Sequence, residues 1–526
     1  SDYLSDLKDS DYCMTEQAVD FIKLLGPAVD EFKARAGTKY EALETFCDKV
    51  FYDLAPVEMA GTNLNLGSNN DMQALLYLLL GLPIRIRTKV QKKSIRHEYK
   101  LPGSPSTDAS AIDFALANDC EGENAWKAEV LKALKAYAAA STRLSIYWTP
   151  YPLWADEEGF IYPNFTMPGT VTRRPTGGSP NLLQVSKGIV RRCFVPRTSD
   201  NVIVSVDFAS QELRVMAAVT GDANFLSAYI NEEGKDKDLH AMTACGIVPS
   251  VIGKYDGITP EDIMMSKQPS GVTLVDYGWF KEHQDDDSPI GKMLKSVRGI
   301  SKTVNFGVGY GAVAQTVSQQ AMIPLDISEN AVDGFHLAYP GVNKWKEAVY
   351  RFAKVHGYVA TTYGSRRHCG NGLNTGNRSE VGRWERQLTN FLIQGQCADL
   401  LKVVLASAHR TQLFQRYNAY LIAPIYDEVL CEVPKRHLHA FLHELADLME
   451  VKMPGIIVPM VADCSFGGDW YKQEEVGARP TQETIDKALA KVEAYVAERR
   501  ASMVVSSESD DDSVLHMVDE AIEDGE

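Results

Sequence analysis

The chain has 526 residues, of which 45% are hydrophobic and 24% are charged, and its formal net charge is −16. These are ordinary globular values, so wholesale disorder, collagen-like and coiled-coil architectures are excluded, and the length suggests several structural units. The longest apolar runs are about ten residues, roughly half of what a membrane span needs. Nine cysteines without a C-x-x-C pair favour reduced thiols over a disulfide framework or a zinc site. Taken alone, the negative charge argues against a nucleic-acid partner.

The charge is distributed unevenly along the chain. Residues 506–526 hold nine carboxylates and no Lys or Arg, so residues 1–505 carry a net charge of only −7. Two basic islands, 84–100 and 172–197, each carry a net charge of +6. Basic islands in an acidic chain are typical of proteins that contact phosphates along a track, although each island alone also fits a solvated surface.

Hydrophobic periodicity, caps and turn residues predict the elements in chain order. Helices are expected over 14–55, 70–81 (with a cap at 68–70), 108–117, 123–141, 211–221, 290–306, 379–408, 435–451 and 480–500. Strands are expected over 202–208 and in a hairpin of 419–425 and 429–433, with short strands and turns over 143–172. Residues 247–290, interrupted by Gly, Pro and Asp, are expected to be an inserted surface segment. The chain is therefore expected to be α+β, with widely separated strands in one sheet.

Two carboxylates stand at predicted strand ends. Asp207 closes the strand 202–208, and Asp427 occupies the turn of the hairpin. A carboxylate is costly beside an apolar strand unless it is paired or metal-bound. Two oxygen ligands from separate strands suit Mg²⁺, which takes one or two carboxylates together with substrate phosphates. Each acid alone is also compatible with an ordinary turn.

One predicted helix carries a ladder of side chains at i+4 spacing, formed by Arg298, Lys302, Phe306 and Tyr310. The four share one helix face over about 18 Å. The two cations can hold a polyphosphate, and the two aromatic rings can stack on a base. The face therefore fits a nucleoside triphosphate. The sequence GVGYG at 307–311 also looks like a dinucleotide loop, but no apolar strand precedes it.

A second i+4 ladder consists of Arg386, Asn390 and Gln394. Long hydrogen-bonding side chains in a row can contact the minor-groove acceptors of a duplex, which are nearly alike for every base pair. A polar solvent face is the alternative. The apolar residues around Ile393 indicate a helix that is otherwise buried, which favours the functional interpretation.

Together these segments resemble the A-family (polymerase I-like) DNA polymerases. Residues 207–214, DFASQELR, resemble the family motif D-Y-S-Q-I-E-L-R, and the ladder with Asn305, Gly307 and Gly311 matches the family's fingers-helix motif. Tyr426–Glu428 resembles the family's H-D-E turn. Further similar segments follow the family order from about residue 63 to 470: 65–83, 106–107, 170–174, 180–182 and 385–399. The compact chain with extra segments favours a bacteriophage-type member.

The resemblance implies a right-hand polymerase fold with an antiparallel palm sheet, helical fingers and a helical thumb. The implied domains are a helical lead-in (1–60), the thumb (61–150), the palm (151–222 and 376–473), the fingers (223–375, with the inserted segment 247–290) and a C-terminal extension with an acidic tail (474–526). About 60 residues before the thumb are too few for the family's exonuclease domain, so this chain is expected to lack proofreading unless that activity lies on another chain or was removed.

The resemblance also implies template-directed DNA synthesis by two-metal phosphoryl transfer. Asp207, Asp427 and the carbonyl of Phe208 would hold two Mg²⁺ ions, which Mn²⁺ can replace, with Glu428 assisting and Lys302 also catalytic. The dNTP would be bound by Arg298, Lys302, Phe306, Tyr310, Glu212, His240 and Gln211. Among these, Glu212 would be the steric gate that excludes a ribose 2′-hydroxyl. Primer–template DNA would be bound by Arg174, Asn181, Arg386, Asn390, Gln394 and Tyr426.

The sequence departs from the family pattern at several positions. Tyr426 replaces the family His, and residues 208–211 read Phe-Ala-Ser-Gln in place of Y-S-Q-I. A single-subunit RNA polymerase and a catalytically inactive polymerase-like DNA-binding protein are the alternatives. Glu212 argues against the first and the intact Asp207 and Asp427 against the second. Action in the cytoplasm of a bacterium or a phage-infected cell is expected rather than in an organelle, without a membrane partner, and the acidic tail is a candidate docking segment for a replication partner.

Overall fold

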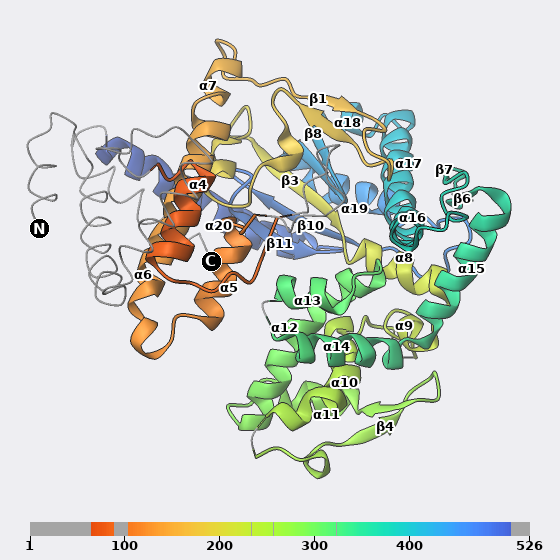
Figure 1. Cartoon of the computed structure of the whole chain (residues 1–526). Helices are drawn as coiled ribbons and strands as arrows, with labels where there is room; N and C mark the ends of the chain where they lie inside the picture. The colour runs from red at the N-terminus through yellow and green to blue at the C-terminus, as the bar shows by residue number, and fades with distance from the viewer. Residues whose placement is uncertain (1–64, 89–103, 233, 256, 322, 507–526) are drawn as a thin grey trace, which may run out of the picture. The chain divides into compact units, whose positions relative to one another are not determined.

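The computed structural model describes residues 65–88, 104–232, 234–255, 257–321 and 323–506. The predicted helix 14–55, most of the basic island 84–100 and the acidic tail after residue 506 lie outside these ranges. The chain divides into two compact units, residues 1–142 and 143–526, and each is described by itself (Figure 1).

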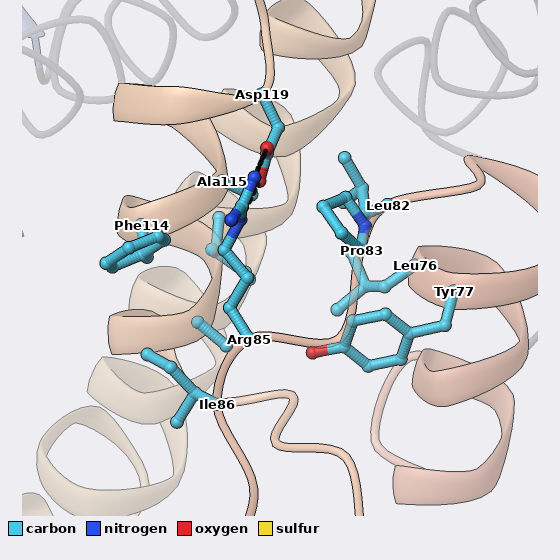
Figure 2. A pocket seen from close by; sticks show the side chains of 11 residues that line it. Leu76, Tyr77, Leu82, Pro83, Arg85, Ile86, Phe114, Ala115 and Asp119 are labelled. Carbon is cyan, nitrogen blue, oxygen red and sulfur yellow. Dashed lines mark hydrogen bonds and ion pairs between the residues drawn. The ribbon is translucent and has the colours of Figure 1, made fainter. Parts of the chain in front are cut away.

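The first unit is helical, as the sequence predicted. Its helices are α4 (Asn69–Gln73), continued by the π-helix η2 (Ala74–Leu79), then α5 (Ala109–Asn118), the 3₁₀ turn η3 (Gly122–Asn124) and α6 (Trp126–Arg143). Ser68 caps α4 by accepting a hydrogen bond from the Asp71 amide, and Asp108 caps α5. Leu75, Val130 and Leu131 are fully buried in its core. A shallow pocket lies beside the ion pair of Arg85 with Asp119 (Figure 2).

The second unit is built on a five-stranded sheet of spatial order β11-β10-β3-β9-β8, with all neighbours antiparallel. Its strands are β3 (Asn201–Phe208), β8 (Tyr420–Ile425), β9 (Glu428–Pro434), β10 (Ala462–Gly467) and β11 (Gln473–Gly477). Three two-stranded sheets accompany it: β1 (Asn164–Thr166) with β2 (Thr176–Gly178), β4 (Met265–Lys267) with β5 (Thr273–Val275), and β6 (Tyr358–Ala360) with β7 (Arg366–His368). The sequence predicted β3, β8 and β9, which come from widely separated segments, but it did not predict β10 and β11.

Side chains on β3 alternate between two buried faces of the sheet. Val202, Val204 and Val206 belong to the main core together with residues of α19 (Leu438–Met449), whereas Ile203 packs in a second cluster with Trp470. Because both faces are covered, the strand is apolar along most of its length. Asp207, the last residue but one, is the exposed position of the strand, and the final residue Phe208 is buried again.

Helices surround the sheet in the second unit. They are η4 (Leu144–Trp148), α7 (Tyr151–Trp154), η5 (Leu182–Gln184), η6 (Ile189–Cys193), α8 (Gln211–Thr220), α9 (Ala223–Ser227), α10 (Leu239–Val251), η7 (Ile252–Lys254), η8 (Pro260–Asp262), α11 (Tyr277–His283), α12 (Pro289–Gly309), α13 (Ala314–Ala321), α14 (Leu325–Ala338), α15 (Pro340–His356), α16 (Arg378–Asn390), η9 (Phe391–Gly395), α17 (Gln396–Arg410), α18 (Leu413–Arg416), η10 (Lys435–His437) and α20 (Gln482–Ser506). Helices α10, α12 and α14 pack side by side (Figure 1).

Two sequence predictions about segments need correction. Residues 144–154 are largely helical rather than strands and turns, because aromatic residues such as Tyr147 pack into the cluster around Trp470. The segment 247–290 is not confined to the surface. Val275 and Phe280 are fully buried in the main core, since Gly and Pro mark turns and say nothing about burial.

Among the described residues, one continuous helical stretch, Arg378–Arg410, is long and apolar enough by length and composition to cross a membrane. Most of its apolar window is buried inside the protein, as in the core helix of a globular domain.

Candidate active site

Two acidic side chains meet where strand β3 ends and strand β8 turns into β9. This end of the strands is the sheet edge. Asp207 lies near the end of β3, and its register partner on β9 is Glu428. Asp427 lies in the two-residue turn between β8 and β9, where its neighbour Tyr426 has a φ of 58°. The Phe208 amide donates a hydrogen bond to the Asp427 carbonyl over 3.3 Å. The sheet register therefore places Asp207, Asp427 and Glu428 together, as the sequence predicted for strand-end acids.

The electrostatics of this edge show that it holds excess negative charge. Desolvation at the strand end, and then the charges of Asp427 and Glu428, raise the pKa of Asp207 to about 7. Burial also raises the pKa of Asp427 and of Glu428. Lys187, from the basic island 172–197, opposes the shift at both aspartates. Mutually repelling carboxylates of this kind are stabilised by a bound cation.

The donor set fits a hard divalent cation. The Oε1 atom of Glu428 is buried without a hydrogen-bond partner, so the edge has unused acceptor capacity. Within the described residues, no group of three or more His, Cys, Asp or Glu side chains is arranged to hold a metal ion. Asp207 and Asp427 offer two carboxylates, which suits Mg²⁺ because this ion takes its other ligands from substrate phosphates and water.

Helix α12 presents the predicted ladder to solvent. It starts at the cap Ser288 with Pro289 in its first turn, and buries Val297, Val304 and Val308 on its inner face. Lys302 is exposed on the opposite face, and Phe306 keeps 46% of its surface accessible. The i+4 spacing therefore predicted a real accessible stripe.

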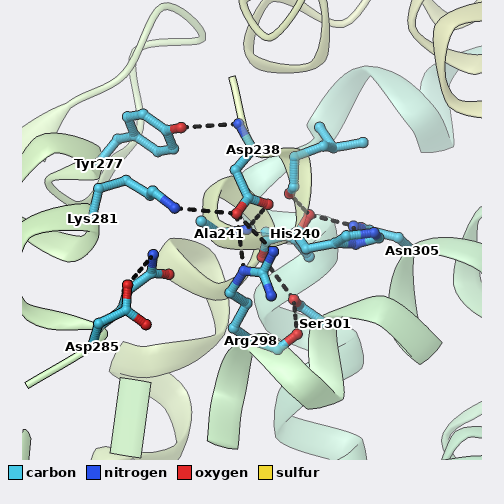
Figure 3. Close-up of polar contacts among 12 residues, drawn as sticks. Asp238, His240, Ala241, Tyr277, Lys281, Asp285, Arg298, Ser301 and Asn305 are labelled. Atoms are coloured by element: carbon cyan, nitrogen blue, oxygen red, sulfur yellow. Dashed lines mark hydrogen bonds and ion pairs between the residues drawn. The ribbon is translucent and has the colours of Figure 1, made fainter. Parts of the chain in front are cut away.

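A polar network fixes the start of this ladder. Arg298 Nε donates a hydrogen bond to Asp238 Oδ2 over 2.9 Å, and Arg298 Nη2 forms an ion pair with the same oxygen at 2.8 Å. His240 Nδ1 lies 2.9 Å from Nδ2 of the buried Asn305, and its ring lies 6.2 Å from that of Phe306 between centroids. Burial and the cations Arg298 and Lys302 lower the pKa of His240, although Asp238 opposes them. Figure 3 shows Asp238 at the centre of this network.

Glu212, in the first turn of α8, joins the end of α12 to the sheet edge. Its carboxylate accepts hydrogen bonds from Arg174 and from the Tyr310 hydroxyl. Burial raises the pKa of Glu212, and the charge of Asp427 adds to this effect while Arg174 opposes it. The bond between Glu212 and Tyr310 brings the aromatic end of the α12 ladder to the carboxylates.

The predicted DNA-binding residues occupy several environments. The guanidinium of Arg174 lies 5.6 Å from the centroid of the Tyr426 ring. Asn181 caps η5 by accepting from the Leu183 amide over 3.2 Å. A Cβ at Gly311 would lie 2.9 Å from Cγ of Arg386, so Arg386 lies against the end of α12.

The second ladder is interrupted by the π-helix η9, which begins after Asn390. The Oδ1 atom of Asn390 is buried without a hydrogen-bond partner, and Gln394 interacts with Glu212 by hydrogen bonding. Gln211, which the resemblance assigned to the dNTP, is buried beneath the accessible face.

Sequence reasoning missed two residues of the network and one cation at the sheet edge. Asp238 immediately precedes the Leu-His pair at 239–240, and its position as a helix cap was a usable signal. Lys187 belongs to the basic island 172–197, but only the fold shows that its charge acts on the two aspartates. Lys281 approaches Asp238 Oδ2 to 3.4 Å, and nothing in the sequence indicated this contact.

Comparison with known proteins agrees with this geometry. Residues 49–257 and 285–472 match the model of DNA polymerase family A, and the chain therefore belongs to this family of DNA-directed DNA polymerases. The POL domain of Pol1 from M. smegmatis, solved in complex with DNA primer-template and dNTP, superposes with a TM-score of 0.59 at 21% identity over 86% of this chain and 65% of that one. The fold is thus the α+β right-hand fold of an A-family polymerase domain.

Curated relatives include DNA polymerase I of Streptococcus pneumoniae strain R6, which is 26% identical over 420 residues, or 79% of this chain and 41% of the relative. The thermostable DNA polymerase I of Thermus aquaticus is 26% identical over 426 residues, or 79% of this chain and 43% of the relative. The chain therefore aligns with about two fifths of the length of these relatives. Residues 258–284 lie between the two ranges that match the family.

Proposed function

We propose that the chain is a template-directed DNA polymerase that adds dNTPs to the 3′-hydroxyl of a primer. The observation that carries this proposal is the hydrogen bond between Tyr310 and Glu212. It joins the solvent-facing ladder of α12 to the sheet edge that bears Asp207 and Asp427. A triphosphate on the cations of α12 therefore has its reacting end directed toward carboxylates that can hold a divalent ion.

Each part of the reaction has its own residues in this proposal. Asp207, Asp427 and the carbonyl of Phe208 would hold two divalent ions, with Glu428 beside them; bound Mg²⁺ or Mn²⁺ would supply activation of the 3′-hydroxyl and charge stabilisation of the leaving pyrophosphate. The protein's own share of phosphoryl transfer is positioning and charge neutralisation. The cations Arg298 and Lys302 bind the triphosphate, with His240 beside them, and Phe306 and Tyr310 contact the nucleoside.

Primer–template DNA and dNTPs are the proposed partners. The DNA lies against the palm (151–222 and 376–473), where Arg174, Asn181, Arg386, Asn390, Gln394 and Tyr426 are proposed to contact it. The fingers (223–375) carry α12, and residues 61–150 form the thumb. The contacts of Arg174 and Gln394 with Glu212, and of Arg174 with the Tyr426 ring, support this assignment. By analogy with bacterial relatives, the enzyme acts in the cytoplasm of a bacterium or a phage-infected cell.

The test is primer extension with Mg²⁺ and either dNTPs or rNTPs. Extension with dNTPs is expected. Preference for rNTPs would favour an RNA polymerase, and duplex binding without any extension would favour an inactive DNA-binding protein. Reactions without dNTPs measure shortening of the primer, which this chain is expected not to perform.

Asp427→Asn tests the catalytic assignment. It is expected to reduce extension by about 10²–10³-fold or more, because it removes one charged ligand from the site, while duplex binding measured by fluorescence anisotropy is retained. Asp463→Asn is the matched control, since Asp463 is an exposed aspartate in register with Asp207 on β10. Near-normal turnover of Asp427→Asn would contradict the assignment.

The acidic segment 506–526 is proposed, from its charge alone, to contact a basic replication protein. Deletion of residues 507–526 with a measurement of processivity in the presence and absence of purified candidate partners tests this proposal. Unchanged processivity with every candidate would contradict it.

A further inference from the structure

Helix α11 contributes side chains to the polar network around Arg298. This helix lies in residues 258–284, between the two family-matched ranges. The Tyr277 hydroxyl accepts a hydrogen bond from the Asp238 amide over 2.9 Å, and Lys281 Nζ lies 3.4 Å from Asp238 Oδ2 (Figure 3). A segment without a counterpart in the family match therefore contacts the carboxylate that holds Arg298.

Asp238 is the shared acceptor for both cations. Arg298 Nη2 lies 2.8 Å from the same Oδ2 atom that Lys281 approaches. Asp238 is also the cap of α10 and accepts from the Ala241 amide over 3.1 Å. Its side chain is 19% exposed, whereas Lys281 and Arg298 are 38% and 32% exposed. The carboxylate is thus fixed, and the two cations at its rim are open to solvent.

We propose that Lys281 is a positioning residue for nucleotide binding, which acts by sharing Asp238 with Arg298. This inference rests on the proposed polymerase function and on the assignment of Arg298 to the triphosphate. Lys281 offsets part of the Asp238 charge. Arg298 is consequently held less tightly and can turn toward an incoming triphosphate.

Removal of the Lys281 charge is expected to weaken nucleotide binding in two ways. Asp238 would bind Arg298 more strongly, since a second cation no longer competes for Oδ2. The uncompensated carboxylate would also repel the triphosphate. Both effects weaken nucleotide binding. Because the pair is partly exposed, the expected effect is about two- to fivefold, the scale of a surface ion pair.

Replacement of Lys281 is expected to leave α11 folded. The helix is anchored by Phe280, which is fully buried, and by the stacking of Trp279 on His283 at 4.5 Å between centroids. Asp276 caps its first turn through the Trp279 amide. The Lys281 head group belongs to none of these contacts, so its charge can be removed separately from the packing.

The experiment measures the dNTP dissociation constant on a complex of the full chain with a dideoxy-terminated primer–template, so that no chemical step intervenes. Lys281→Met is expected to weaken binding about two- to fivefold, and Lys281→Arg is expected to restore it. Lys292→Met is the matched control, because Lys292 is an exposed lysine on α12. Unchanged affinity of Lys281→Met would overturn the inference.

A double-mutant cycle with Asp238→Asn separates positioning from direct contact. Asparagine retains the capping ability of Asp238 but lacks its charge. In the Asp238→Asn background, Lys281→Met is expected to have no further effect. A full effect in that background would show that Lys281 contacts the phosphates directly and would overturn the positioning role.

Failure of the proposed function has a different signature. A wild-type chain that binds no dNTP on the primer–template and extends no primer would refute the polymerase assignment itself. A wild-type chain that extends primers, with Lys281→Met equal to wild type, would refute this inference alone.

Discussion

Glu212 is the side chain through which two distant parts of the second unit meet. Arg174 precedes it by 38 residues and Tyr310 follows it by 98, and each donates to a different carboxylate oxygen. Two donors on a half-buried carboxylate fix its orientation more firmly than one would. A fixed carboxylate beside the α12 ladder can exclude a substituent by volume, which is the role that the resemblance gave to a steric gate.

Glu212→Ala is therefore expected to lower discrimination against ribonucleotides. The truncated side chain leaves room for a 2′-hydroxyl, and we expect the ratio of kcat/KM for dNTP to that for rNTP to fall by about 10–10²-fold. Single-nucleotide incorporation with matched dCTP and CTP measures this ratio. Glu212→Gln is the control, because it keeps the volume of the side chain. Undiminished discrimination by Glu212→Ala would show that another group excludes the ribose.

At the scale of residues, the sequence predicted what local periodicity controls. The ladder from Arg298 to Tyr310 could be predicted because a helix fixes which residues share a face. The partner of Arg298, Asp238, lies 60 residues away, and such a pairing depends on the packing of α10 against α12. Single-sequence patterns contain no information on that packing.

At the scale of elements, the C-terminal end of α12 depends on a helix that the sequence did not connect to it. Lys346 of α15 is only 8% exposed, and its Nζ donates to the Val308 carbonyl over 2.8 Å. The last carbonyls of a helix lack intrahelical partners, so a hydrogen-bond donor there stabilises the end. Burial lowers the pKa of Lys346 to about 8. The terminal turn of α12, which leads to Tyr310, is thus held by a buried amine.

This burial predicts a pH dependence of stability. Below pH 8 the lysine is protonated in both states, and the folded protein carries the full cost of a buried charge. Between pH 8 and 10.5 the folded form loses its proton before the unfolded form does, so stability rises with pH. The difference between about 8 and the ordinary 10.5 corresponds to about 3 kcal/mol.

Lys346→Met provides the measurement. Urea-unfolding midpoints of the wild type and the variant are compared at pH 7.5, 9 and 10.5 (chosen as roughly spanning the two pKa values). The wild type is expected to gain stability relative to the variant as the pH rises. Parallel midpoints across this range would show that Lys346 is not the group that titrates.

The bounds of elements were predicted well where hydrophobic patterning and turn residues agreed. The burial of a segment was predicted poorly, because it depends on packing against distant helices. The strand ending at Asp207 and the hairpin around Asp427 have the expected bounds within one or two residues. The segment 247–290 contributes Phe280 to the core although its turn residues suggested a surface insertion. Turn chemistry reports local backbone geometry, whereas burial depends on which helices cover the segment.

At the scale of the whole molecule, the net charge of −16 argues against a nucleic-acid partner, whereas the distribution of charge along the chain favours one. The basic island 172–197 supplies Lys187, whose charge acts on both Asp207 and Asp427. It also supplies Arg191, whose guanidinium lies 4.0 Å from the centroid of a Trp470 ring and whose charge acts on Glu428. The local charge of this island therefore acts at the strand-end acids, and its contact with phosphates stays a prediction that the total charge alone would have excluded.

The segment after residue 472, where the family match ends, is attached to the same region. Helix α20 buries Ile485 and Val492 in the main core. Asp469, which is fully buried, accepts hydrogen bonds from Arg499 Nη1 over 2.8 Å and from the Tyr495 hydroxyl over 2.9 Å. Arg499 Nη2 in turn donates to the Arg192 carbonyl over 2.9 Å. One arginine of α20 thus joins the C-terminal helix to the basic island.

Arg499→Met is expected to destabilise the second unit by about 3 kcal/mol, because it leaves the buried carboxylate of Asp469 without its cation. Urea-unfolding midpoints at pH 7.5 measure the change, and Arg500→Met is the control, since Arg500 is the exposed neighbour on the same helix. Asp469→Asn in the Arg499→Met background is expected to recover part of the loss, because it removes the unpaired charge while retaining an acceptor for the Tyr471 and Lys472 amides. If Arg499→Met were as stable as Arg500→Met, the attachment of α20 would depend on its apolar face alone, and the ion pair with Asp469 would contribute nothing to the fold.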